Sequence, residues 1–169
     1  MRRFLDFLYD GAAWLAALAM VGVLAMVLLS IVSRQVGFHV PGTDAYAGYA
    51  MAAAGFLALA HTLKRNEHIR VTLLLGRLEG KAHHALEMWA LTAGVFLAGL
   101  FAFYAVRLAW VSHSINDIST SNDATPLWIP QLSMAVGTIV LMLAFADELV
   151  LEWTGRRREA APAEALHHE

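Results

Sequence analysis

The sequence contains no cysteine and few charged residues. Of its 169 residues none is Cys, and only 15% are Asp, Glu, Lys or Arg. Without cysteine, the chain can form no disulfide, no thiolate nucleophile and no thiolate metal site. The formal net charge is −2, so the sequence also lacks the basic excess that nucleic-acid binding requires. These absences exclude disulfide-rich proteins, cysteine enzymes and nucleic-acid-binding proteins.

Apolar residues are abundant instead, at 59% of the sequence with a mean hydropathy of +0.55. A soluble domain of this length would lack the polar surface to cover them. Most lie in four stretches, residues 12–32, 45–63, 86–111 and 128–151. Each is close to or above the roughly 20 residues that a helix needs to cross a bilayer. The sequence therefore predicts an all-α integral membrane domain of four spans in residues 1–155, followed by a disordered cytoplasmic tail at residues 156–169.

The positive charges lie at alternate ends of these stretches. Ten of the twelve Lys and Arg residues are Arg2, Arg3, Lys64, Arg65, Arg70, Arg77, Lys81, Arg156, Arg157 and Arg158. The positive-inside rule places these ends, and both termini, in the cytoplasm. The first stretch is expected to be retained rather than cleaved as a signal peptide, because Asp6 and Asp10 precede it and it is longer than a signal core.

The connection between the second and third stretches has the pattern of an amphipathic helix. Apolar side chains recur at helical spacing, whereas the basic ones fall on another face; the residues are Arg70, Val71, Leu74, Leu75, Arg77, Leu78 and Lys81. Such a helix is expected to lie in the cytoplasmic interface, where its basic face meets anionic lipid headgroups. Contact with a partner protein is the alternative.

Small residues form a stripe in the third stretch. Ala90, Gly94, Ala98 and Ala102 recur every fourth residue, a spacing that allows helix backbones to approach closely in lipid. Two interpretations remain open at this point. The stripe packs the four helices of this chain against one another, or it packs against a larger membrane partner.

The two connections on the opposite side contain more acidic than basic residues. They hold Arg34, Asp44, Asp117 and Asp123, and we expect them to face the periplasm. The polar segment from Ser112 to Thr125 is either a plain solvated loop or a surface for a periplasmic partner.

The sequence offers no convincing catalytic or cofactor site. Eight histidines are present, but His61 and His113 fall at opposite ends of their spans, too far apart to ligate one haem. His61 with His83 or His84 would be a wet surface site. Neighbouring residues such as Ser112, His113 and Asp117 rarely form a catalytic triad. We therefore predict no cofactor, no bound metal and no enzymatic activity.

The acidic residues at the end of the fourth stretch favour interface polarity over an ion site. They are Asp147, Glu148 and Glu152, and Glu152 is spaced to pair with Arg156. No charged residue lies deep in any stretch, which argues against a self-sufficient transporter.

Two segments resemble a known family. They are residues 58–75, ALAHTLKRNEHIRVTLLL, and residues 125–137, TPLWIPQLSMAVG. With the four stretches, they resemble the small membrane subunit (DctQ-like, or Q subunit) of tripartite ATP-independent periplasmic (TRAP) transporters, over about residues 4–153. Many members carry a Trp and one or two Glu before the second span, where this chain has Pro41-Gly-Thr-Asp44.

The resemblance implies a role in sodium-driven uptake of an organic acid across the bacterial inner membrane. In such systems a DctM-like large membrane subunit holds the substrate and sodium sites, and a DctP-like periplasmic protein delivers the substrate. The small subunit is expected to brace the large membrane subunit and to help dock the periplasmic protein. By this resemblance, Arg34, Asp44, Asp117 and Asp123 are the candidate docking residues, whereas the Ala90–Ala102 stripe and the interfacial helix would brace the partner.

Two alternatives remain: a self-sufficient homo-oligomeric transporter or channel, and a haem-binding membrane subunit. The identity of the organic acid lies beyond this sequence, because the selective residues would be on other chains.

Overall fold

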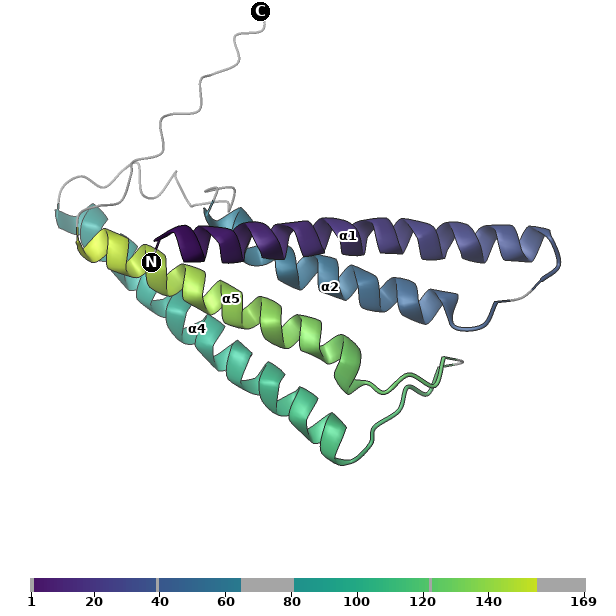
Figure 1. The fold of residues 1–169 in the computed structure, drawn as a ribbon. Coiled ribbons are helices and arrows are strands. Elements are labelled where there is room, and N and C mark those ends of the chain that lie inside the picture. Colours follow the sequence, from purple (N-terminus) through teal and green to yellow (C-terminus); the bar gives the residue numbers. More distant parts are fainter. Residues whose placement is uncertain (1, 39, 65–80, 122, 155–169) are drawn as a thin grey trace, which may run out of the picture.

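The computed structural model describes residues 2–38, 40–64, 81–121 and 123–154, and this part of the chain is helical. Its helices are α1 (Arg2–Gln35), α2 (Thr43–Lys64), α4 (Lys81–Ser114) and α5 (Trp128–Trp153) (Figure 1). Each of the four apolar stretches lies inside one of them. Within the described ranges the only β-type pairing is an isolated bridge between Ile118 and Pro126. The predicted all-α class is confirmed.

Three of the helices are long and apolar enough to cross a membrane, over Leu5–Gln35, His84–Ser114 and Trp128–Trp153. Helix α2 does not reach the same apolar character, because much of it is alanine and glycine, interrupted by Tyr46 and Tyr49. Four crossings and a cytoplasmic position for both termini therefore stay predictions. Residues 70–78 of the expected interfacial helix and the tail at residues 156–169 lie outside the described residues.

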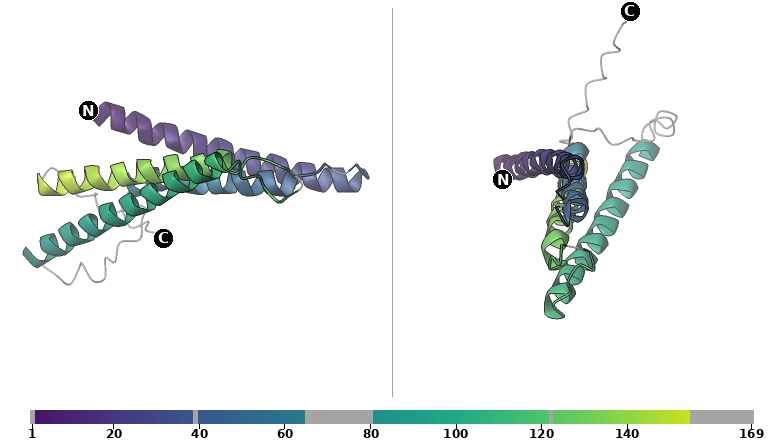
Figure 2. Two further views of the ribbon diagram at one scale, coloured as in Figure 1. Left: turned by 90° about the horizontal axis from the view of Figure 1, so that it is seen from below. Right: turned by 90° about the vertical axis from the view of Figure 1, so that its right-hand side faces the viewer.

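The helices lie in one row, in the order α1, α2, α5, α4 (Figure 2). Helices α1 and α2 form one antiparallel pair, α4 and α5 form the other, and α2 packs against α5 to join the pairs. We call the end that carries residues 36–38, 40–42, 115–121 and 123–127 the loop end. The opposite end, which carries residues 5–10, 61–64, 84–87 and 147–153, is the terminal end.

Small side chains fill the joint between the two pairs. Ala60 on α2 and Ala144 on α5 are fully buried, and Gly137 on α5 lies against the backbone of Phe56 on α2. A Cβ atom added to Gly137 would lie 2.5 Å from the Phe56 carbonyl oxygen, so only glycine permits this approach. Close backbone contact is how helices gain packing energy in lipid, where association has little hydrophobic driving force.

Two helices end in the same backbone motif at the loop end. Gly37 follows α1 with φ of 75°, and Asn116 follows α4 with φ of 52°. The amide of each donates to the carbonyl three residues before it, and the next amide reaches back five residues, to Ser33 and Ser112. This is the Schellman arrangement, which satisfies carbonyls at the helix end and favours Gly or Asn at the left-handed position. It sets the direction in which both loops leave their helices.

Candidate functional site

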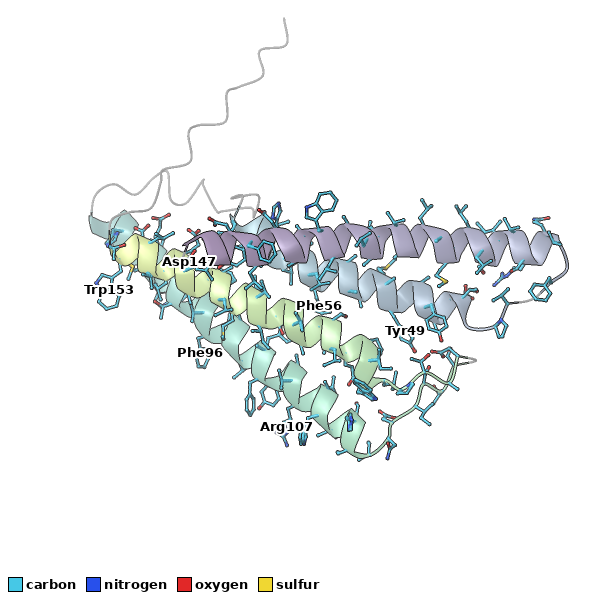
Figure 3. The ribbon with its side chains drawn as sticks, in the orientation of Figure 1. Tyr49, Phe56, Phe96, Arg107, Asp147 and Trp153 are labelled. Atoms are coloured by element: carbon cyan, nitrogen blue, oxygen red, sulfur yellow. The ribbon has the colours of Figure 1, made fainter. Side chains whose placement is uncertain are left out.

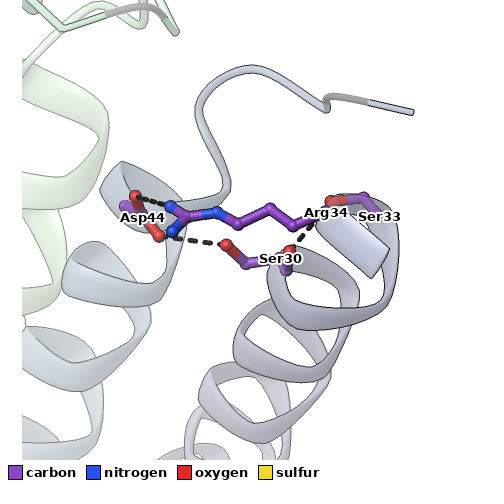
Figure 4. A network of polar contacts seen from close by, with 4 residues as sticks. All are labelled: Ser30, Ser33, Arg34 and Asp44. Atoms are coloured by element: carbon purple, nitrogen blue, oxygen red, sulfur yellow. Dashed lines mark hydrogen bonds and ion pairs between the residues drawn. The ribbon is translucent and has the colours of Figure 1, made fainter. Parts of the chain in front are cut away.

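Arg34 and Asp44, two of the four predicted docking residues, form an exposed pair at the loop end. The Arg34 guanidinium lies 3.5 Å from the Asp44 carboxylate, and both side chains are more than two-thirds exposed (Figure 4). The Ser30 hydroxyl donates to the other Asp44 oxygen over 3.3 Å. The pair therefore bridges the end of α1 and the start of α2. An ion pair this exposed adds little stability, roughly 0–1 kcal/mol, so both charges are available to a partner.

Asp123 is held within the chain by a set of hydroxyl donors. The Tyr49 hydroxyl on α2 donates to one carboxylate oxygen over 3.0 Å, and the Ser119 hydroxyl donates to the other over 2.8 Å. A second link runs from the Thr125 hydroxyl to the Tyr46 hydroxyl over 3.1 Å. These bonds tie the loop between α4 and α5 to the first turns of α2.

The same contacts set the acidity of Asp123. Desolvation alone would raise the pKa of its carboxyl, but side-chain hydrogen bonds, including those from Ser119 and Tyr49, outweigh it and hold the pKa below its usual value of 3.8. Asp123 is therefore a charged and oriented group at neutral pH.

The two loops meet at Gly42 and Asp123. Gly42 has φ of 82°, and a Cβ atom placed on it would lie 2.9 Å from the Asp123 Cβ. The backbone of Asp117 also holds this loop in place. Its amide donates to the Ser112 carbonyl, and its carbonyl accepts from the Leu127 amide. Within the described residues no side-chain partner holds the Asp117 carboxylate. The structure thus pairs Arg34 with Asp44, fixes Asp123, and leaves the Asp117 carboxylate at the surface.

The small-residue stripe of α4 lies partly inside this chain. Ala98 and Ala102 are buried, and Gly94 faces Phe145 of α5 so closely that a Cβ atom would lie 2.9 Å from its ring. Ala90 is exposed. The buried side of α4 continues to Ala105, Ala109 and Ser112. Most of the stripe therefore contributes to the α4–α5 joint.

A charged cluster at the terminal end was missed by sequence reasoning. The Lys64 ammonium on α2 contacts the Asp147 carboxylate on α5 and lies 3.4 Å from Glu148. Figure 3 labels Asp147 near the end of α5. The Lys64 ammonium also sits 5.2 Å from the ring centroid of Tyr9 on α1, a side chain that is 2% exposed. Three helices therefore converge on one partly buried cation, and the acidic residues are more than surface polarity. The available signal was that Lys64 and Asp147 end neighbouring apolar stretches on the same predicted side.

Two histidines at the same end pair with acids. The His61 Nδ1 atom lies 3.6 Å from Asp10, and the His84 Nδ1 atom lies 2.8 Å from Glu152. The expected Glu152–Arg156 pair falls outside the described residues, and the structure gives Glu152 a contact with His84 instead. Both histidine contacts join helices rather than gather ligands around one point, and no group of three metal-binding side chains occurs within the described ranges.

A shallow groove runs between α1 and α2. Its volume is about 550 Å³, and it is lined mainly by alanines with Met20, Met51 and Gly55, with His61 and Thr62 at one end. Alanine and methionine surfaces accept apolar chains, whereas a carboxylate or a metal ion needs donors or oxygen ligands. The groove suits lipid or another helix.

The sequence matches the family model described as tripartite ATP-independent periplasmic transporters, DctQ component, over residues 23–155. The matched range begins within α1 and includes α2, α4 and α5, as well as both loops of the loop end. No curated protein matches the chain.

Proposed function

We propose that this chain, which belongs to the DctQ component family of tripartite ATP-independent periplasmic transporters, braces the large membrane subunit and helps dock the periplasmic binding protein. The observation that carries the proposal is the family match over residues 23–155. It makes the chain a small membrane component of a transporter. The bracing role, the docking role and sodium-driven uptake of an organic acid across the bacterial inner membrane are the proposed parts.

The row of helices supports the bracing role. A row one helix thick leaves broad apolar faces on α1 and α4, where Trp14, Leu18, Phe96 and Phe103 are each more than 60% exposed. A bilayer or a membrane partner must cover these faces, since water cannot. The glycine and alanine joints between the pairs hold the row together from inside.

The arrangement of the loop end supports the docking role. In the proposed orientation this end faces the periplasm. Asp123 and Gly42 join the two loops into one surface, on which Arg34, Asp44 and Asp117 present charge. Exposed charges on a fixed surface steer a partner and set its register more than they add affinity.

Substrate and sodium are assigned to the large subunit. The groove of this chain offers alanine and methionine surface, and the Lys64 ammonium is already paired with Asp147 and Glu148 within the chain. Neither feature is built for an organic acid. The residues that select the substrate are therefore proposed to lie on the partner, together with any sodium ligands.

The test is reconstitution of the complex from this chain and its two proposed partners. The tagged chain is expressed with its chromosomal neighbours, purified in mild detergent, and titrated with the binding protein. We expect a large multi-span subunit to co-purify in stoichiometric amount. We also expect Asp117→Lys and Arg34→Glu to weaken binding-protein association several-fold at low salt while leaving the membrane complex intact.

Asp10→Asn provides the control, because Asp10 is an exposed acid at the terminal end. It should leave binding-protein association unchanged. If the large subunit is absent from the purified material, the bracing role is wrong. If the two loop-end variants bind the periplasmic protein as well as the unaltered chain does, the docking role assigned to these residues is wrong.

A further inference from the structure

The outward face of α4 carries a heptad pattern that none of the other described helices contacts. Trp89, Phe96, Phe103 and Trp110 recur every seventh residue, and each is between 63% and 76% exposed. Leu100 and Arg107 fall between them at the alternate three- and four-residue spacing. Residues spaced in this way form one seam along a helix, as in the a and d positions of a left-handed helix pair.

This seam faces away from the other described helices. The buried residues of α4, such as Ala98, Ala102, Ala105 and Ala109, lie on the opposite side of the helix, against α5. Figure 3 shows Phe96 and Arg107 pointing outward from α4, on the side away from α5. Helix α4 is at the edge of the row, so this face is unoccupied within the described residues.

Arg107 is the one charged residue of this seam. It lies inside the apolar span His84–Ser114, seven residues before its end, which is about 10 Å along the helix axis. Among the described residues none pairs with its guanidinium. A permanent cation within an apolar span requires an acceptor, which is a headgroup phosphate if the side chain extends to the interface, or a carboxylate on whatever packs in the seam.

The exposed face of α1 offers a comparison within the same chain. Its large exposed side chains along the middle of the helix are mostly aliphatic, including Leu18, Val21, Leu24 and Leu28, and none is charged. Such a surface suits acyl chains. The α4 seam combines regularly spaced aromatic rings with one cation, which suits the side chains of a second helix.

We propose that the outward face of α4 is the docking seam for one transmembrane helix of the large membrane subunit, which supplies a carboxylate to Arg107. The inference rests on the proposed function, because it takes the large subunit as partner. A second copy of this chain is a poorer occupant. Two copies in one membrane share an orientation, so a two-fold axis along the membrane normal would place Arg107 against Arg107. The repulsion of like charges in an apolar layer opposes that contact.

The test is site-specific photo-crosslinking in the assembled complex. A benzophenone amino acid replaces Phe103 in the seam or, as the matched control, Leu18 on α1, which is equally exposed at 63%. The full chain is expressed with the large subunit in native membranes and irradiated. We expect an adduct with a transmembrane helix of the large subunit from position 103 and adducts with lipid from position 18, both identified by mass spectrometry.

A second measurement tests the charge. Arg107→Glu should lower recovery of the large subunit on the order of tenfold or more, as truncation of a desolvated charge pair does, whereas Arg107→Lys should retain most of it. The partner carboxylate nearest the crosslinked residue, changed to Arg, should restore recovery to Arg107→Glu.

The outcomes separate this inference from the proposed function. If the unaltered chain recovers the large subunit but position 103 forms adducts only with lipid, the seam is wrong and the bracing role stands. An adduct between two copies of this chain, or an adduct with the large subunit from position 18 alone, also overturns it. Failure to recover the large subunit at all contradicts the proposed function itself.

Discussion

The Tyr49 hydroxyl on α2 donates a hydrogen bond to the Asp123 carboxylate in the loop between α4 and α5, over 3.0 Å and 74 residues of sequence. This bond joins the two helix pairs at the loop end, where their axes have diverged (Figure 1). The α2–α5 joint also connects the two pairs, further along these helices toward the terminal end. The position of the loop therefore depends on α2 as much as on the helices that it connects.

Removing this hydroxyl should change the acidity of Asp123. In Tyr49→Phe the pKa of the Asp123 carboxyl should rise toward 3.8, because one of the hydrogen bonds that lower it is gone. Tyr104→Phe is the control, since Tyr104 is an exposed side chain on α4. The pKa of Asp123 can be followed by carboxyl-carbon NMR in detergent micelles. An equal value in Tyr49→Phe and in the unaltered chain would contradict the assignment.

The same shift predicts how the loop responds to acid. The pKa of Asp123 is lower in the folded chain than in the unfolded one, so the carboxylate stabilises the fold fully above the unfolded value of 3.8. That stabilisation is lost as the pH falls through the lower, folded value. Acid-active proteolysis should therefore cut the 115–127 loop faster below this pH, and Asp123→Asn should be cut at one rate across the same range.

The contact between Gly137 and Phe56 should tolerate no added methyl group. In Gly137→Ala the new Cβ would overlap backbone atoms of Phe56, which cannot rotate away as a side chain can. We expect the free energy of unfolding to fall by about 1–3 kcal/mol, the range for overpacked cores. Gly48→Ala is the matched control on α2, because nothing lies within 4 Å of its added Cβ. Thermal unfolding in a single detergent compares the two, and equal midpoints would show that the helices are not in close contact.

Replacing Lys64 alone should lower the stability of the fold more than replacing Lys64 together with Asp147. Lys64→Met leaves Asp147 and Glu148 partly buried beside each other, and breaking a buried pair in this way costs about 3 kcal/mol or more. The double variant Lys64→Met with Asp147→Leu should recover part of that loss. A double-mutant cycle by thermal unfolding measures the coupling, and strictly additive effects would mean that the contact has no energetic role.

Two alanines of the α4 stripe should respond differently to the same substitution. Ala98 is 6% exposed in the joint with α5, so Ala98→Leu should lower the unfolding midpoint of the isolated chain. Ala90 is exposed, and Ala90→Leu should leave that midpoint unchanged. If Ala90→Leu instead reduces recovery of the large subunit, this first residue of the stripe contacts the partner.

The helices could be predicted because their signals are local. An apolar stretch of about 20 residues leaves the chain few alternatives in lipid, since backbone groups must be satisfied within the helix. The pair Pro41-Gly42 likewise marks a turn locally, and Gly42 has φ of 82° in the structure. The positions of the helices could therefore be predicted without knowledge of the contacts between them.

The contacts at the two ends were less accessible, because they join residues that are distant in sequence. Lys64 and Asp147 are separated by 83 residues, and Tyr49 and Asp123 by 74. Only the order of the helices in the row brings them together, and periodicity does not determine that order. The sequence showed that small residues recur every fourth position in α4. It did not show that Ala98 is buried and Ala90 is exposed, which only the structure reveals.

The row of helices has an energetic consequence for the chain on its own. The buried cluster around Tyr9, Ala60 and Ala144 is small, and most of α1 and α4 has only one helix beside it, so the chain has little dry interior to stabilise it independently. Whatever covers α1 and α4 binds only the folded form and therefore adds to its stability by mass action. The melting temperature of the purified chain should consequently depend on the detergent or partner that surrounds it as much as on its sequence.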